Sequence, residues 1–201
     1  MSVKPWLEVC MKPRNAIRGL IETNTSVWPL ASVYGIASAF FFAHFYSLGF
    51  SHSFFSIFLS MFLLGPILGS FFILLDAWLL QKTGSLFGGL ANNSQCRTIL
   101  AWSKAPYLIS LSLWLLFFAQ DSSAAFLFVA SESSALCITL ITVSIYAWSF
   151  ILLIQMVRDI QLFSFSRALL NTILVSFLSF AVICVSMFVI RFIYSFLVNL
   201  F

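Results

Sequence analysis

Long apolar runs alternate with short polar segments along the chain. The runs cover roughly residues 28–47, 54–80, 99–119, 135–157 and 169–198. A helix of about 20 residues crosses about 30 Å of hydrocarbon, because it rises about 1.5 Å per residue. The strands of an outer-membrane barrel would alternate apolar and polar positions, and these runs do not. The pattern therefore predicts an all-α fold, a polytopic membrane helical bundle with five transmembrane helices in a single domain over residues 1–201.

The composition agrees with this pattern. Hydrophobic residues make up 62% of the 201 residues and charged residues only 8%, whereas soluble domains are about 25% charged. The formal net charge of +4 rests on ten lysines and arginines, which are spread between the apolar runs and form no basic-aromatic platform for nucleic acid. We therefore expect a lipid bilayer, and not nucleic acid, as the partner.

A short amphipathic helix is predicted in the cytoplasmic segment before the first run. Pro13 suits a first helical turn, Ile17 and Leu20 share one face, and Arg14 and Arg18 lie towards another. Such a helix is typical of the membrane interface; a solvated tail is the alternative. The first 26 residues contain no apolar h-region, so no removed signal peptide is expected.

The longest polar interruption runs from residue 81 to residue 106, QKTGSLFGGLANNSQCRTILAWSKAP. Its glycines let the backbone bend, and its amides offer hydrogen bonds. Together with the amino-terminal helix it predicts a cytoplasmic interaction face for anionic lipids or for a membrane or cytoplasmic protein. The candidate residues are Lys12, Arg14, Arg18, Lys82, Gly88, Gly89, Asn92, Arg97 and Lys104. Orientation in the membrane is the alternative role for these cations.

The second run carries Gly65, Pro66 and Gly69. The glycine spacing lets another helix approach closely, and a self-contact there would make a homo-oligomer. Pro66 removes one backbone hydrogen bond and permits a kink, which packing explains and a hinge would use.

Asp76 lies near the end of the same run. A carboxylate in hydrocarbon is costly and suggests a functional site. Its position favours an interfacial cap or an ion pair with Lys82, and the alternative is a transport role together with Pro66.

The third run is interrupted near its start by Lys104 and Pro106, so a bend is expected there. Residues 124–130 are too short to cross the membrane alone and either lie at the outer interface or extend the third span. His44 and His52 are read as interfacial histidines.

The cations predict the topology. Four Lys and Arg precede the first span, three lie between the second and third, and two between the fourth and fifth; the other two connections have none. Because cytoplasmic loops are enriched in Lys and Arg, the amino terminus is expected in the cytoplasm and the carboxyl terminus outside.

Motifs for catalysis are missing from the sequence. It has no nucleotide-binding loop, HExxH, GxSxG or paired intramembrane carboxylate. The four cysteines form no CxxC pair and have no histidines at metal-ligand spacing. We expect a protein that is not an enzyme and that uses no cofactor or metal.

Three stretches resemble the Ypt-interacting protein (Yip) family of five-span membrane proteins. They are PWLEVCMKPRNAIRGLIE, GPILGSFFILLDAWLLQKTGSLFGG and LAWSKAPYLI, spread over most of the chain. The resemblance implies a helical membrane domain with a cytoplasmic amino terminus. Eukaryotic members are associated with Rab-type GTPases and vesicle traffic, but their long cytoplasmic amino-terminal region is missing here, which is more similar to bacterial members.

A membrane scaffold or adaptor in membrane organisation or trafficking is therefore the expected function, and a small-solute or ion transporter or channel is the alternative. A bacterial inner membrane is the expected location, with a eukaryotic endoplasmic reticulum or Golgi membrane as the alternative.

Overall fold

The computed structural model describes residues 9–10, 13–22, 25–122, 124–127 and 133–198, without the side chains of residues 13–15, 18, 22, 124, 187 and 189–198. This part of the chain contains helices and no strand, which confirms the predicted all-helical fold. The elements are α2 (Pro13–Glu22), α3 (Trp28–Phe45), η1 (Leu48–Phe50), α4 (Phe54–Leu86), α5 (Asn93–Ser103), α6 (Tyr107–Gln120), η2 (Ala124–Phe126), α7 (Ser133–Gln161) and α8 (Phe165–Val198).

Four helices are long and apolar enough to cross a membrane by themselves: α3, α4, α7 and α8. Helices α5 and α6 meet the same condition only together, and they enclose a 40° bend across residues 104–106. The bend predicted at Pro106 is therefore present. The described part of the chain thus has four candidate spans, or five if the bent pair α5–α6 is one span.

Helices α3 and α4 form a hairpin whose contact surface is made of glycine. A Cβ atom added to Gly35 would lie 1.8 Å from the Gly65 carbonyl oxygen, and one added to Gly69 would lie 2.2 Å from the Ala31 carbonyl oxygen. Only residues without a side chain allow this approach of two helix backbones. Gly65 and Gly69 therefore face α3 of the same chain, and a self-contact between copies through this face would have to displace α3.

Helix α4 continues to Leu86, six residues beyond the predicted end of the second span. It ends in a glycine turn: Gly88 has a φ of +81°, and the Gly89 N–H donates to the Gly84 carbonyl at 2.8 Å. A left-handed glycine that closes such a bond ends a helix without steric strain. Leu79 and Leu80, just before this extension, are buried, and α5 and α8 pack against α4.

Two apolar clusters fill the bundle. The first includes Leu80, Leu100 and Met156, and the second includes Phe40 and Trp114. Three tyrosines are in ring contact at the edge of the first cluster. The ring of Tyr34 on α3, which packs against that cluster, lies 5.1 Å from that of Tyr107 on α6, and the Tyr107 ring lies 4.6 Å from that of Tyr146 on α7, centroid to centroid. These three rings form an aromatic layer in the bundle.

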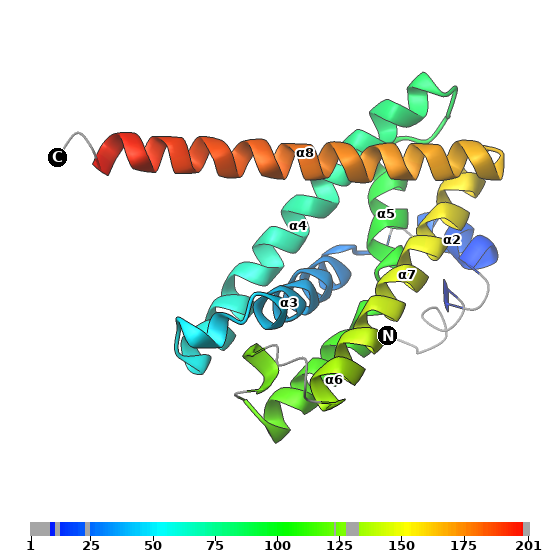
Figure 1. Cartoon of the computed structure of the whole chain (residues 1–201). Coiled ribbons are helices and arrows are strands. Elements are labelled where there is room, and N and C mark those ends of the chain that lie inside the picture. Colours follow the sequence, from blue (N-terminus) through cyan, green and yellow to red (C-terminus); the bar gives the residue numbers. More distant parts are fainter. Residues whose placement is uncertain (1–8, 11–12, 23–24, 123, 128–132, 199–201) are drawn as a thin grey trace.

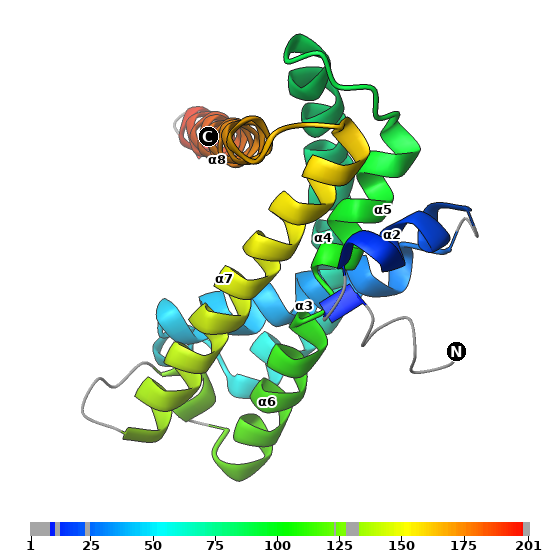
Figure 2. The ribbon, with the colours of Figure 1, turned by 90° about the vertical axis from the view of Figure 1, so that its right-hand side faces the viewer.

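The long helices differ in how far their neighbours cover them. Figure 2 shows α6 and α7 side by side, with α5 continuing beyond α6. The amino-terminal half of α8 packs across α4 and α7, whereas its carboxyl-terminal end extends beyond the other helices (Figure 1). Its exposed Val185 and Phe188 lie on this projecting part.

Two short segments pack on the bundle: the amino-terminal helix predicted at the membrane interface, and residues 124–126 of the segment predicted either at the outer interface or as an extension of the third span. The helix after Pro13 is present as α2, but its Ile17 and Leu20 are buried in the first apolar cluster rather than turned towards lipid. In η2, Ala125 and Phe126 are fully buried in the second cluster. Residues 128–130 of the predicted outer segment lie outside the described residues.

Candidate functional site

Asp76 lies inside the bundle, partly buried on α4. The Ser179 hydroxyl of α8 donates a hydrogen bond to its carboxylate. The cation that attracts the carboxylate is Lys104, from the α5–α6 bend. Lys82, the partner that the sequence suggested, is exposed near the carboxyl-terminal end of α4. The structure therefore assigns Asp76 to an interhelical site.

Lys104 points into the aromatic layer. Its ammonium lies 5.0 Å from the ring centroid of Tyr34 and 5.5 Å from that of Tyr107. A cation within about 6 Å of an aromatic face is attracted by the negative charge on that face. Tyr107 in turn stacks on Tyr146, with ring centroids 4.6 Å apart. The bend at residues 104–106 aims Lys104 inwards, so it is not part of the predicted interaction face.

The glycines of the 81–106 segment make room for a side chain from α7. The Gln161 Nε2 donates to the Leu80 carbonyl at 3.2 Å. A Cβ atom on Gly84 would lie 2.1 Å from this Nε2, and one on Gly89 would lie 1.7 Å from the Gln161 Oε1. The amide of Gln161 therefore fills the space between the end of α4 and the following loop, and it fixes the loop to α7.

The amides of the same segment begin α5. The Asn92 Oδ1 accepts from the Gln95 N–H at 2.9 Å, and the Gln95 Oε1 accepts from the Asn92 N–H at 3.0 Å. This reciprocal capping box satisfies backbone donors at the helix start. Gly88, Gly89 and Asn92 thus have structural roles in this segment.

Of the cations predicted for the interaction face, Lys82 and Arg97 are exposed in the described part of the chain. Arg97 lines a polar pocket of about 190 Å³ between the start of α3 and the first turns of α5, together with the hydroxyl residues Thr25, Ser26 and Ser94. Of the other predicted face residues, Lys12 lies outside the described residues, and the side chains of Arg14 and Arg18 are not described.

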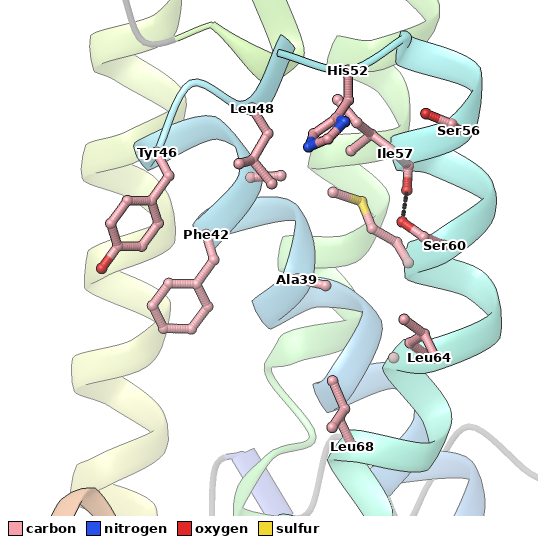
Figure 3. Close-up of a pocket in the computed structure, with 13 residues that line it drawn as sticks. Ala39, Phe42, Tyr46, Leu48, His52, Ser56, Ile57, Ser60, Leu64 and Leu68 are labelled. Atoms are coloured by element: carbon pink, nitrogen blue, oxygen red, sulfur yellow. Dashed lines mark hydrogen bonds between the residues drawn. The ribbon is translucent and has the colours of Figure 1, made fainter. Parts of the chain in front are cut away.

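Pro66 lies within the continuous helix α4, where the Ser70 hydroxyl donates to its carbonyl at 2.7 Å. Towards the hairpin between them, α3 and α4 diverge and leave an open groove of about 610 Å³, which is lined from Leu68 to His52. Figure 3 shows Phe42 and Tyr46 on the α3 side of the groove and the α4 side chains opposite. Mostly apolar residues line the groove, as expected for a surface in contact with lipid tails.

His44 and His52 have different environments. His52 is exposed at the hairpin, whereas His44 is fully buried and donates from Nδ1 to the Ala125 carbonyl at 3.2 Å. The His44 ring also lies 5.0 Å from that of Trp114, centroid to centroid. His44 therefore holds η2 against α3 and is not an interfacial residue. Within the described part of the chain, no group of three His, Cys, Asp or Glu residues could hold a metal ion.

Sequence reasoning missed four residues of these sites: Ser179, Tyr34, Gln161 and His44 as a buried group. Each becomes significant only through a partner more than 65 residues away or on a helix that the sequence does not place beside it. Buried polar residues in an apolar helix are the one available signal, because each of them requires a partner.

Comparison with known proteins adds no name to this arrangement: no family model, no curated protein and no solved structure matches the chain.

Proposed function

We propose that this protein is a non-enzymatic membrane scaffold or adaptor of Yip type, which crosses the membrane five times and binds a cytoplasmic protein through the face that carries Lys82 and Arg97. It acts in membrane organisation or trafficking, in a bacterial inner membrane. The amphipathic helix α2 belongs to the same face.

The contact between Gln161 and the loop after α4 supports five crossings. Gln161 is the last residue of α7, and Gly84 and Gly89 follow the apolar part of α4, yet the three residues touch. Both chain positions therefore belong on one side of the membrane, which requires an even number of crossings between them. Since α7 crosses once, the bent pair α5–α6 has to cross as well.

The distribution of charge supports a cytoplasmic location for this end. Lys82, Arg97, Arg158 and Arg167 are all exposed. They lie on α4, α5, α7 and α8, near the α4–α5 and α7–α8 connections, which meet at the top of Figure 1. The opposite end carries the hairpin around η1 and the connection after α6, where Asp121 is the exposed charge. Among the described side chains, the exposed lysines and arginines gather at this one end, which is the distribution of a cytoplasmic face.

The single observation that carries the adaptor proposal is the Arg97 pocket. A guanidinium beside hydroxyl groups is suited to a carboxylate or phosphate, because it offers several N–H donors in a fixed geometry. The capping box and Gln161 hold the surrounding backbone in place, so the pocket is part of a rigid surface.

Crosslinking and mass spectrometry in native membranes test the proposal. The adaptor predicts a reproducible soluble partner that is crosslinked near residue 97 and is lost in the Lys82→Gln/Arg97→Gln double variant. The matched control is Arg158→Gln/Arg167→Gln, which removes the same charge from the neighbouring connection and should keep the partner. If the double variant and the control behave alike, the cations serve orientation and the adaptor proposal is wrong.

Binding to nanodiscs forms the second arm of this test. Anionic lipids attract basic residues by about 1 kcal/mol each. Enrichment of anionic lipid around the wild type that Lys82→Gln/Arg97→Gln reduces, with no crosslinked protein, would identify lipid rather than a protein as the ligand of the face.

Transport is the second candidate function, because Asp76, Ser179 and Lys104 place a charged site between helices α4, α8 and the α5–α6 bend. Intramembrane charges that face a bundle interior often belong to ion or proton pathways, and Pro66 would supply the hinge. Proteoliposomes with an ion gradient test this function. Flux that Asp76→Asn abolishes and Lys82→Gln preserves would support transport; no flux above that of empty liposomes would exclude it for the ions tried.

A further inference from the structure

Helices α6 and α7 face each other in a regular antiparallel register. At one end the Ser149 hydroxyl of α7 donates to the Ser103 carbonyl at 2.7 Å. One turn further, Tyr107 of α6 stacks on Tyr146 of α7. Each turn towards the carboxyl end of α6 is thus matched by a turn towards the amino end of α7.

The next turn of this register places Ser110 opposite Thr142. Ser110 follows Tyr107 by three positions, and Thr142 precedes Tyr146 by four, so each shares a helix face with its tyrosine. Both side chains have an exposed fraction of 0%. Two fully buried hydroxyls therefore lie on the facing sides of α6 and α7; we call this place the α6–α7 seam.

These two hydroxyls differ from the other buried hydroxyls of the described residues. Serine and threonine in helices usually donate to a carbonyl of the preceding turn, and Thr83, Thr98, Ser103 and Thr172 do so. Ser149 and Ser179 donate across helices. Ser110 and Thr142 have no hydrogen-bond partner among the described protein atoms. Buried polar groups are otherwise almost always bonded to protein or to ordered water.

Further polar groups lie close to the seam. The indole N–H of Trp114, one turn beyond Ser110, is buried and has no hydrogen-bond partner among the described residues; the Trp114 ring itself packs against Phe40 and His44 of α3. The Tyr146 hydroxyl, on the other side of Thr142, is buried and faces Ser38 of α3. Hydroxyls can donate and accept, whereas an indole N–H only donates. The described residues of the seam include no carboxylate, and its hydroxyls suit a small neutral molecule that both donates and accepts.

We propose that the α6–α7 seam binds at least one internal water molecule, held between the hydroxyls of Ser110 and Thr142. Water satisfies the donor and acceptor needs of both groups, and two to four polar partners are what a buried water requires. The water extends the polar layer of Lys104 and the tyrosines towards the second apolar cluster. This inference concerns the seam alone and does not depend on the adaptor function.

Footprinting with X-ray-generated hydroxyl radicals tests the water directly, because the radicals form from water beside the labelled ring. In detergent-solubilised full-length protein, Trp114 and Tyr146 should be labelled faster than the buried Phe40. Replacement of both hydroxyls, in Ser110→Ala/Thr142→Val, should lower their labelling several-fold. The matched control is Ser112→Ala/Thr139→Val, which removes hydroxyls that donate to Leu108 and Ala135 of their own helices; its labelling should equal that of the wild type.

Equal labelling of Trp114 and Phe40 in the wild type would overturn the proposal, whether or not the variants fold. An experimental structure at a resolution that shows waters is the second readout. Density within hydrogen-bond distance of both hydroxyls is expected. Hydroxyls turned to the Pro106 and Ile138 carbonyls, with no density between them, would contradict the proposal.

Discussion

Ser179 of α8 donates a hydrogen bond to the Asp76 carboxylate of α4, a contact between residues 103 positions apart. Lys104 supplies the opposite charge from a third element, the α5–α6 bend. The site therefore joins helices from distant parts of the chain, and its loss should be felt in the stability of the whole bundle.

A double-mutant cycle measures the attraction between Asp76 and Lys104. Asp76→Asn leaves Lys104 without its counter-charge, and we expect a loss of about 1–3 kcal/mol in the free energy of unfolding. Lys104→Met should cost less in the Asp76→Asn background than in the wild type. Reversible unfolding in mixed micelles is the measurement.

Lys82 provides the matched control for this cycle. Because Lys82 is exposed, Lys82→Met and Asp76→Asn should have additive effects. A coupling of Asp76 with Lys82, and none with Lys104, would show that the pairing suggested by the sequence is correct and the arrangement described above is not.

Replacement of Gly35 by alanine should destabilise the protein. Helix propensity alone would favour alanine by about 1 kcal/mol, but the added Cβ would clash with the backbone of Gly65, which cannot move without separating α3 from α4. We expect a net loss of about 1–3 kcal/mol in the free energy of unfolding.

Gly19→Ala is the control for this steric effect, because a Cβ atom on Gly19 in α2 meets nothing within 4 Å. It should be neutral or slightly stabilising. A Gly35→Ala protein as stable as Gly19→Ala would mean that α3 and α4 do not approach each other through these glycines.

The fit of Gln161 against the loop predicts a second coupling. Gly89→Ala should displace the Gln161 amide from the Leu80 carbonyl and cost about 1–2 kcal/mol. In a Gln161→Ala background the space is already vacant, so the same substitution should cost clearly less. Hydrogen exchange of the amides of residues 84–92 reports the loosening of the loop.

Gly88→Ala is the control for this coupling, made both in the wild type and in the Gln161→Ala background. Its φ of +81° strains any other residue, by about 1–2 kcal/mol, whatever side chain is at position 161. Gly88→Ala should therefore cost the same with and without Gln161. Equal behaviour of Gly88→Ala and Gly89→Ala would contradict the role assigned to Gln161.

The fold class could be predicted because it depends on local pattern. Apolar runs of spanning length, the bend at Pro106 and the glycine turn after α4 are each encoded within a few residues. The spacing of Gly65 and Gly69 also predicted a close contact with another helix. The partner glycine, Gly35, belongs to no motif, so the identity of the neighbouring helix was not predictable.

The candidate site was only partly predictable, because side-chain direction depends on which helices are neighbours. Lys104 looks like other loop cations in the sequence, yet the α5–α6 bend turns it towards Tyr34 and Tyr107. Gln161 looks like an ordinary residue at the end of a span, and its role follows from glycines more than 70 positions earlier. Asp76 was recognisable as unusual, but its partners Ser179 and Lys104 were not.

The central claim is that the chain crosses the membrane five times, with a bent third span. It is tested most directly by measuring on which side of the membrane each of three chain positions lies. Single cysteines would replace the exposed residues Ser51, Leu90 and Ser164 in a background whose four native cysteines are alanine, and a membrane-impermeant maleimide would be applied to vesicles of either orientation. Five crossings predict labelling of positions 90 and 164 from the cytoplasmic side and of position 51 from the opposite side. Labelling of positions 90 and 164 from opposite sides would contradict the account.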